Sequence, residues 1–334
     1  MIARLLLLSG VLLSLLGAAP ASALDLKIAT VAPDGSVWMR AMRQGADEIR
    51  ECTGGRVNFK FYAGGVMGND KSVLRKIRVG QLHGGAFTAG GLADVYPDLG
   101  LYSLPLQFRS LAEVDYVRSR LDPLLLQGLE SAGFISFGFA EGGFALLMAD
   151  VPVRSTTDMK SRKVWVPEGD TISYRGMETL GLSPVTLPLT DVMTGLQAGL
   201  INIIPASPIA AVAFQWYTRI KYVTDTPLSY LTALLAIDGR AFKRLNAADQ
   251  AVVREVMGRI YQNLDHQNRL DDAAAAAAMR QQGVAFVTPE PAAVEHWRNV
   301  AANLARELRQ EGTFTPQLFD RLQELLAEYR RAGN

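Results

Sequence analysis

Short apolar runs alternate with amphipathic segments over the first third of the chain. An apolar run at 26–30 is followed by apolar positions that recur every three or four residues up to Gly54 and Gly55. An alternating pattern at 56–62, an amphipathic stretch at about 70–80 and an apolar run at 84–90 come next. These periods predict strand, helix, strand, helix and strand, the order of βαβ units with a mainly parallel sheet.

The carboxyl ends of those strands are the expected binding positions. Ligands of open α/β sheets bind in the crevice outside the carboxyl ends of the strands. The loops after the three predicted strands are therefore candidate binding loops, at 31–36, 63–69 and 87–92.

A second alternation begins in the middle of the chain. Residues 134–153 form two consecutive strand-like segments around Glu141, Gly142 and Gly143, long enough to pass from one lobe into another. A strand at 232–238 is expected to return to the first lobe, and the chain beyond it is largely helical. Between these points the pattern predicts strands at 163–167, 183–189 and 200–207 and helices at about 170–181 and 190–199.

These elements predict an α/β protein of two lobes, each a mainly parallel sheet flanked by helices. More than one crossing between the lobes makes a hinge, and a hinge leaves a cleft. The expected division is a first lobe of 24–141 plus about 232–270, a second lobe of 142–231 plus about 283–315, and a C-terminal helix at 316–334.

The first residues have the layout of a secretory signal peptide. Arg4 precedes a leucine-rich run from Leu5 to Leu16, and the small residues Ala21, Ser22 and Ala23 follow. That order predicts cleavage after Ala23 and export to a bacterial periplasm. The apolar run is shorter than the roughly 20 residues that span a bilayer.

Composition excludes several classes of protein. The 334 residues are 49% hydrophobic and 20% charged, which is typical of a packed globular protein. Lys plus Arg is 34 and Asp plus Glu is 33, so nucleic-acid binding has no support. The histidines are not spaced as metal ligands, and the single Cys52 is expected to be a buried helix residue. No motif of a hydrolase, zinc protease or P-loop is present, so no enzyme, metal or cofactor is predicted.

Many segments in the same order resemble the solute-binding proteins of tripartite ATP-independent periplasmic (TRAP) transporters, of the DctP type. They include TGGRVNFKFYAGGVMGND at 53–70, LYSLPLQFRSLAEVD at 101–115, DMKSRKVWVP at 158–167 and GLSPVTLPLTDVMTGLQAGLIN at 181–202. The resemblance implies the two-lobe periplasmic binding protein fold with a long helix. It also implies ligand capture by lobe closure and delivery to TRAP membrane permease subunits.

The departures from the family pattern concern the ligand. The family usually has an arginine that clamps the ligand's carboxylate where this chain has Trp165, and a second arginine where it has Ala145. The family's contact asparagine falls approximately at Ala206, beside Ser207. Val31 and Thr88 stand where some members place polar contacts.

These departures favour a neutral or largely apolar ligand. A buried carboxylate without a partner costs several kcal/mol, whereas an indole face suits an apolar or aromatic molecule. Trp165 is therefore predicted to be a wall of the cleft, with a place in the core as the alternative. Further candidates are Phe87, Phe144, Trp216 and Tyr217, although such aromatic residues more often belong to the core, and Glu141 at the lobe junction.

Two alternatives stay open. An organic acid is the ligand if Arg162, Arg175 or Arg219 replaces the missing arginines. A periplasmic carrier or sensory adaptor without a permease is the other, and adjacent genes for TRAP membrane subunits would argue against it.

Overall fold

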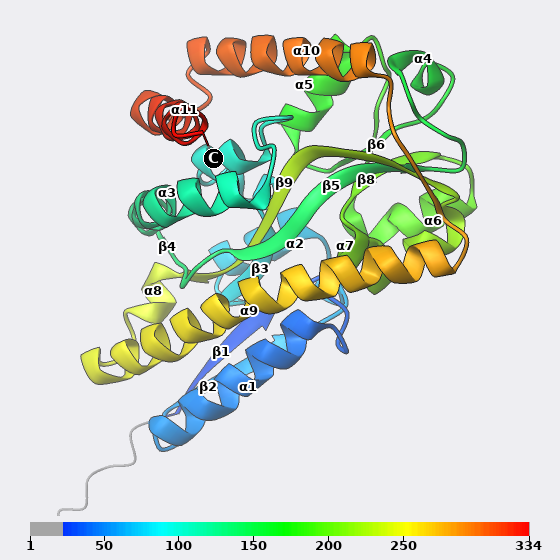
Figure 1. Cartoon of the computed structure of the whole chain (residues 1–334). Coiled ribbons are helices and arrows are strands. Elements are labelled where there is room, and N and C mark those ends of the chain that lie inside the picture. The colour runs from blue at the N-terminus through cyan, green and yellow to red at the C-terminus, as the bar shows by residue number, and fades with distance from the viewer. Residues whose placement is uncertain (1–22, 334) are drawn as a thin grey trace, which may run out of the picture.

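The computed structural model describes residues 23–333, so the predicted signal peptide lies, except for Ala23, outside the described residues. The first lobe follows the predicted alternation of strands and helices (Figure 1). Ser36 begins its first helix by accepting a hydrogen bond from the Met39 N–H, and Asn69 begins the second through Ser72. The elements are β1 (Leu24–Ala29), α1 (Val37–Cys52), β2 (Val57–Tyr62), α2 (Asp70–Arg78) and β3 (Gly84–Thr88).

A connecting region leads from the first lobe to the second. It contains two 3₁₀ turns, a long helix and two strands, of which the second passes into the other lobe. Its elements are η1 (Gly90–Leu92), η2 (Pro97–Ser103), α3 (Leu111–Ser131), β4 (Phe134–Ile135) and β5 (Ala140–Ala149).

The second lobe repeats the alternation with shorter elements. Strands β6 and β7 are a parallel pair, joined to β8 by the bridge between Val164 and Ile203. The elements are α4 (Thr156–Met159), β6 (Trp165–Pro167), α5 (Thr171–Thr179), β7 (Val185–Leu187), η3 (Leu189–Asp191), α6 (Val192–Gln197), β8 (Ile203–Ala206), α7 (Pro208–Ala213) and η4 (Trp216–Arg219).

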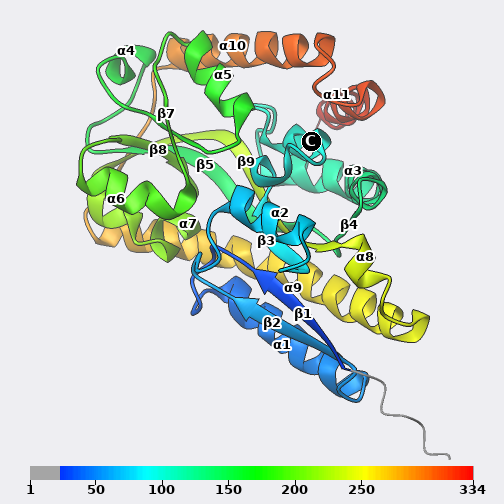
Figure 2. The same ribbon diagram turned by 180° about the vertical axis from the view of Figure 1, so that it is seen from behind.

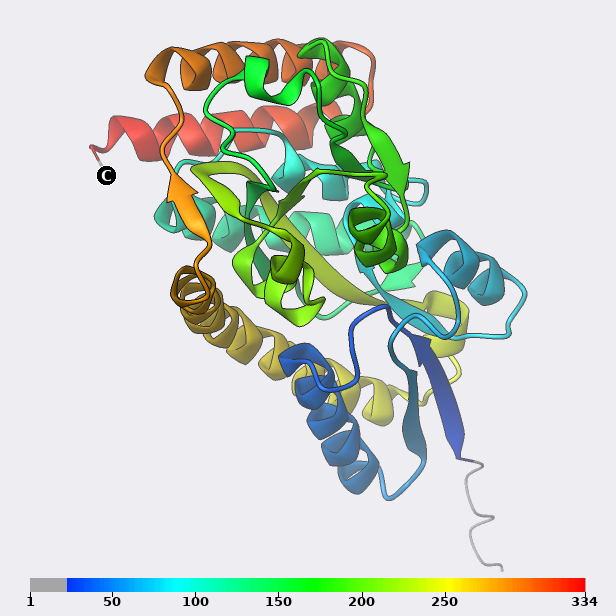
Figure 3. The ribbon, with the colours of Figure 1, turned by 90° about the vertical axis from the view of Figure 1, so that its right-hand side faces the viewer.

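The rest of the chain is one long strand and a set of mostly long helices, as expected. The helices α10 and α11 lie at the opposite end of the molecule from α1 (Figure 3) and pack on α5 and α3 respectively. The elements are β9 (Tyr222–Asp238), α8 (Gly239–Phe242), α9 (Ala247–Gln281), β10 (Ala285–Val287), α10 (Pro291–Gln310) and α11 (Pro316–Arg331).

One mixed sheet runs through both lobes. Its strand order is β2-β1-β3-β9-β5-β8, with β4 and β10 also paired to β9. The pairs β1–β2, β1–β3, β6–β7 and β9–β10 are parallel, whereas β9 is antiparallel to β3, β4 and β5, and β5 is antiparallel to β8. The α/β class and two-lobe arrangement are as predicted. The sheet is less parallel than expected because β5 and β9 cross between the lobes in opposite directions.

The crossing strands join the lobes continuously. The first part of β9 pairs with β10 and the end of β5, and its last part pairs with β3. The helix α9 runs along the sheet and contacts α1 in the first lobe and α7 in the second (Figure 2). The expected lobe boundaries at 141–142 and 231–232 therefore fall inside continuous strands.

Buried apolar clusters cover both faces of the sheet in each lobe. Cys52 does not belong to them. It is exposed at the end of α1, because the buried face of that helix is made of Met39, Met42, Ala46 and Ile49. The expectation that Cys52 is buried was wrong.

Candidate functional site

A small cavity lies between the lobes at the carboxyl ends of their parallel strands. Its volume is about 40 Å³, and we call it the interlobe cleft. The first lobe contributes Val31 after β1, the start of α2 and Thr88 at the end of β3. The second lobe contributes the segments 167–169 and 188–190, which follow β6 and β7. The cleft therefore has the position that an open α/β sheet predicts for a ligand.

The interlobe cleft has polar as well as apolar lining residues, and its charged side chains are mostly carboxylates. Asp70, Asp94 and Glu168 lie in it together with Lys71. Burial and the nearby charge of Glu168 raise the pKa of Asp70 to about 7, against a hydrogen bond with Thr88 that lowers it. Near neutral pH, Asp70 is therefore present in both protonation states and can donate as well as accept a hydrogen bond.

Side chains at the start of α2 contact the second lobe directly. The Asn69 amide Nδ2 donates a hydrogen bond to Glu168 Oε2 at 2.6 Å, and Lys71 Nζ lies 3.5 Å from Glu168 Oε1. Gly65, at φ 74°, lies against Thr190, where an added Cβ would be 2.9 Å from the threonine methyl carbon. Both lobes touch at the rim of the cleft, so entry of a larger ligand requires the lobes to separate.

Two of the predicted site residues line the interlobe cleft. Val31 and Thr88 were expected there from the strand-end rule, and both lie in it. The Thr88 hydroxyl accepts a hydrogen bond from the Gly91 N–H at 3.1 Å, which fixes the turn that follows β3.

Trp165 lies in the core of the second lobe. It is 2% exposed, its ring packs edge-on against Trp216 with centroids 5.6 Å apart, and its Nε1–H donates to the Leu187 carbonyl oxygen at 3.0 Å. Ala206 belongs to the same buried cluster. In this conformation Trp165 has the core position that was the alternative to a cleft wall, and its contact with a ligand stays a prediction.

Ser207 is fully buried beside that cluster, at the start of α7. Its hydroxyl has no hydrogen-bond partner within residues 23–333. It does not line the interlobe cleft.

The remaining predicted site residues are divided between other environments. Ala145 lines an apolar cavity rather than the interlobe cleft. Phe87 is buried in the first-lobe core, and Phe144 packs against the same cluster. Glu141 is 3% exposed and forms an ion pair with Arg269 at 2.7 Å. The structure thus does not gather these residues into one site.

The arginines proposed as replacement clamps lie elsewhere. Arg162 is 3.4 Å from Asp150, and Arg175 on α5 forms an ion pair with Glu311 at 2.5 Å. Arg219 lies at the end of η4. None of the three lines the interlobe cleft, where Lys71 is the lining cation.

Sequence reasoning missed Asp70, Lys71, Asp94 and Glu168. Glu168 and Gly169 follow β6 directly, so the strand-end rule, applied to the second lobe as it was to the first, indicates them. Within the described part of the chain, no group of three or more histidine, cysteine, aspartate or glutamate side chains is arranged to hold a metal ion.

The fold and the position of the cleft define a two-lobe α/β solute-binding protein. The family profile described as bacterial extracellular solute-binding protein, family 7 (DctP), matches residues 28–311, and the chain belongs to that family. The family is one of binding receptors rather than enzymes. The chain is also 22% identical over 211 residues to the uncharacterised protein YiiZ of Salmonella typhimurium, covering 62% of this chain and 64% of that protein.

Solved structures of TRAP periplasmic solute-binding proteins share the fold. One from Xanthobacter autotrophicus, with bound β-D-galacturonate, has a TM-score of 0.83 at 23% identity and covers 90% of this chain and 99% of its own. One from Pseudomonas putida, with bound D-glucuronate, has a TM-score of 0.81 at 20% identity and covers 90% and 97%. Both ligands are sugar acids, so the comparisons do not support the neutral or apolar ligand expected from the sequence.

No helix among residues 23–333 is both long enough and apolar enough to cross a lipid bilayer.

Proposed function

We propose that the chain is the periplasmic solute receptor of a TRAP transporter, and that its ligand is a small hydroxylated organic acid bound in the interlobe cleft. Family membership and the sugar acids held by two solved relatives support this proposal. It replaces the neutral or apolar ligand with the acid alternative, because Trp165 packs in the core and the cleft contains charged side chains, Lys71 among them.

The observation that carries the proposal is the lining of the cleft. Lys71 is the cation there, its side chain is half exposed, and its ion pair with Glu168 is long at 3.5 Å. A ligand carboxylate takes the place of Glu168 beside the ammonium group. Hydroxyl groups of the ligand then donate to Glu168 and Asp94, because ionised carboxylates only accept hydrogen bonds.

The charges in the cleft also favour a ligand with a single carboxylate. One lysine faces three acidic side chains, so a second carboxylate on the ligand has no cation and is repelled by Glu168 and Asp94. A hydroxylated monocarboxylate is therefore preferred over a dicarboxylate. The ligand loses its hydration water as the lobes close over it. The closed receptor is the form that docks on a permease.

A thermal-shift titration of the full-length mature protein tests the proposal. D-Galacturonate, D-glucuronate and L-gulonate are compared with succinate and with an uncharged aromatic compound. We expect stabilisation by at least one sugar acid, since a ligand that binds only the folded state raises the melting temperature. Succinate is expected to give a smaller shift or none.

The Lys71→Met variant is the matched test of the site, and Lys60→Met on β2, outside the cleft, is its control. We expect Lys71→Met to weaken binding by roughly ten- to a hundredfold, the range for loss of a charge-assisted contact, and Lys60→Met to bind normally. Stabilisation by succinate or by the uncharged compound alone would contradict the proposed ligand class. Equal binding by both variants would remove Lys71 from the site.

A further inference from the structure

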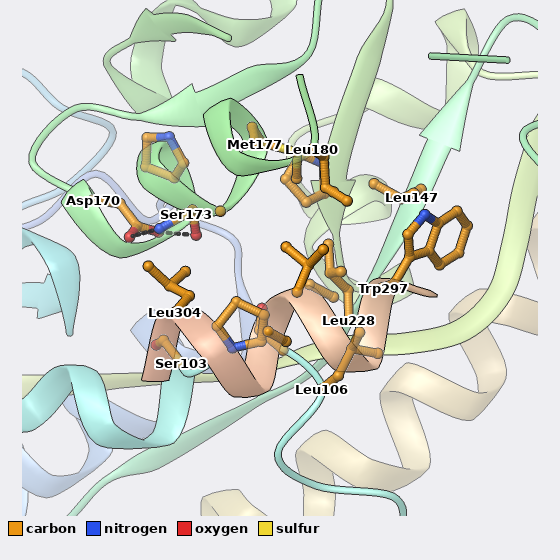
Figure 4. A pocket seen from close by; sticks show the side chains of 18 of the residues that line it. Ser103, Leu106, Leu147, Asp170, Ser173, Met177, Leu180, Leu228, Trp297 and Leu304 are labelled. Carbon is orange, nitrogen blue, oxygen red and sulfur yellow. Dashed lines mark hydrogen bonds between the residues drawn. The ribbon is translucent and has the colours of Figure 1, made fainter. Parts of the chain in front are cut away.

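An apolar cavity of about 70 Å³ lies where the second lobe meets the segment that leaves the first lobe, and Pro167 lines both this cavity and the interlobe cleft. We call it the apolar cavity. Helices α5 and α10, strands β5 and β9 and the segment between η2 and α3 all contribute to its wall (Figure 4). The side chains that face it are mostly aliphatic, with Leu147, Met177, Leu228, Trp297 and Leu304 from four different elements.

The polar groups at its edge already have partners. Asp170 accepts the Ser173 N–H at 2.9 Å and the Ser173 hydroxyl at 2.6 Å, and Trp297 Nε1–H donates to the Thr156 hydroxyl at 2.8 Å. The buried side-chain polar atoms that lack a partner within residues 23–333 belong to residues that do not line this cavity. Water entering it finds few hydrogen-bond partners, and cavities of that kind stay dry and accept small apolar molecules.

The cavity is lined by the segment 103–106 and by β5 and β9, which cross between the lobes. Leu106, in the segment that leaves the first lobe, donates its N–H to the Leu228 carbonyl oxygen on β9 at 2.6 Å. Ala145 on β5 completes the wall. Leu106 has φ 56°, a left-handed conformation that a residue with a branched side chain seldom adopts and that is found more often near functional sites.

We infer that the apolar cavity is a second binding site, separate from the interlobe cleft, for a small uncharged apolar molecule such as a short alkyl compound or a single aromatic ring. Charged molecules are excluded because the ionisable group at its edge, Asp170, is occupied as the cap of α5. The two sites thus differ in ligand class: hydroxylated acids in the cleft, uncharged apolar molecules in the cavity.

The direct test uses benzene as the probe and the methionine methyl groups as reporters. Met159 and Met177 line the cavity, whereas Met42 and Met257 lie in the core of the first lobe. In protein labelled at the methionine methyl carbons, we expect benzene to shift the NMR signals of Met159 and Met177 saturably and to leave those of Met42 and Met257 in place. A crystal pressurised with xenon is expected to show an atom in the cavity.

Gly176 provides a variant that fills the space without a clash. A methyl group added there lies 3.5 Å from Leu304 Cδ2 and 3.9 Å from Pro105 Cγ, both ordinary contacts. We expect Gly176→Ala to weaken benzene binding at least about tenfold. Gly258→Ala on α9 makes the same change to a helical glycine outside the cavity, where the nearest atom is 4.0 Å away, and is expected to bind benzene normally.

Three outcomes would overturn the inference: equal shifts of all methionine signals, equal benzene affinity in Gly176→Ala and wild type, or an empty cavity under xenon. The xenon measurement needs no variant, so it decides the question even if Gly176→Ala does not fold.

Discussion

The interlobe cleft and the apolar cavity both include Pro167, yet they differ in chemistry and in how the fold builds them. The cleft lies at the ends of parallel strands, where short loops bring Asp70, Lys71 and Glu168 together from two lobes. The cavity lies against the face of the sheet, where α5, α10 and the segment 103–106 supply mostly apolar side chains. Strand ends collect polar side chains and backbone groups, and a sheet face covered by helices collects apolar ones.

The cleft and the cavity also differ in how they depend on contact between the lobes. The ion pair and the hydrogen bond of Glu168 join the lobes, so the cleft exists in this form only when the lobes meet. A change in the cleft is therefore expected to alter binding and lobe closure together, whereas a change beside the cavity alters packing.

The largest expected effect tests whether Trp165 belongs to the core or to the cleft. Trp165→Ala removes an indole that is 2% exposed and leaves Trp216 and Leu146 around a void. We expect a loss of about 3–5 kcal/mol in the free energy of unfolding, measured by urea denaturation. Trp165→Phe, which keeps a ring in place, is expected to lose less. Normal stability combined with weaker ligand binding would instead make Trp165 a wall of the cleft.

The next effect concerns the contact between the lobes. Asn69→Ser keeps a side-chain oxygen that caps α2 but removes the amide donor to Glu168. A hydrogen bond to a charged group contributes about 1.5–3 kcal/mol, so we expect ligand affinity to fall roughly tenfold or more. The melting temperature of the ligand-free protein is expected to change little, because serine and asparagine cap helices similarly well. Unchanged affinity would mean that this contact does not hold the lobes together around the ligand.

A smaller effect depends on pH. The pKa of Asp70 is about 7 in the folded protein and near its ordinary value of 3.8 in the unfolded chain. The folded state therefore binds more protons between these values, and stability decreases as the pH rises from about 4 through 7. Asp70→Asn keeps a neutral side chain at every pH. We expect the gain in stability of this variant over wild type to be larger at pH 8 than at pH 5, measured by thermal unfolding.

Glu168→Gln is the control for this prediction. It removes the neighbouring charge that helps to raise the pKa of Asp70. The decrease in stability with rising pH should therefore occur at lower pH in this variant. An anionic ligand should also bind more tightly at pH 6 than at pH 8, because its charge favours the protonated form of Asp70. A pH profile identical in wild type and Asp70→Asn would assign the dependence to another group.

Much of the fold could be predicted from local patterns. Apolar positions at spacings of three and four predicted α1, and the buried face of that helix has this spacing. The long strand β9 was only partly predicted, at 232–238. Its first half contains Asp225 and Pro227, which interrupt the apolar pattern. That half pairs with the end of β5, whereas the second half pairs with the start of β5, and a local pattern does not reveal such long-range pairing.

The site was less predictable, for a physical reason. Alternation along β6 shows that Trp165 and its neighbours Val164 and Val166 point to opposite faces, but both faces of this sheet are buried. Pattern alone therefore does not distinguish the cleft side from the core side. The position of strand ends is a stronger guide, and it placed Val31 and Thr88 in the cleft.

The crossing of β5, β9 and α9 between the lobes has a consequence for how the chain reaches its folded state. The first lobe combines segments distant in sequence, such as β3 and β9, and β9 completes its sheet only after residues 142–221 of the second lobe have been synthesised. Neither lobe is an autonomous folding unit, and no single cut in the gene separates them. A chain of this connectivity folds as a whole, with a large share of contacts between distant residues, which slows folding.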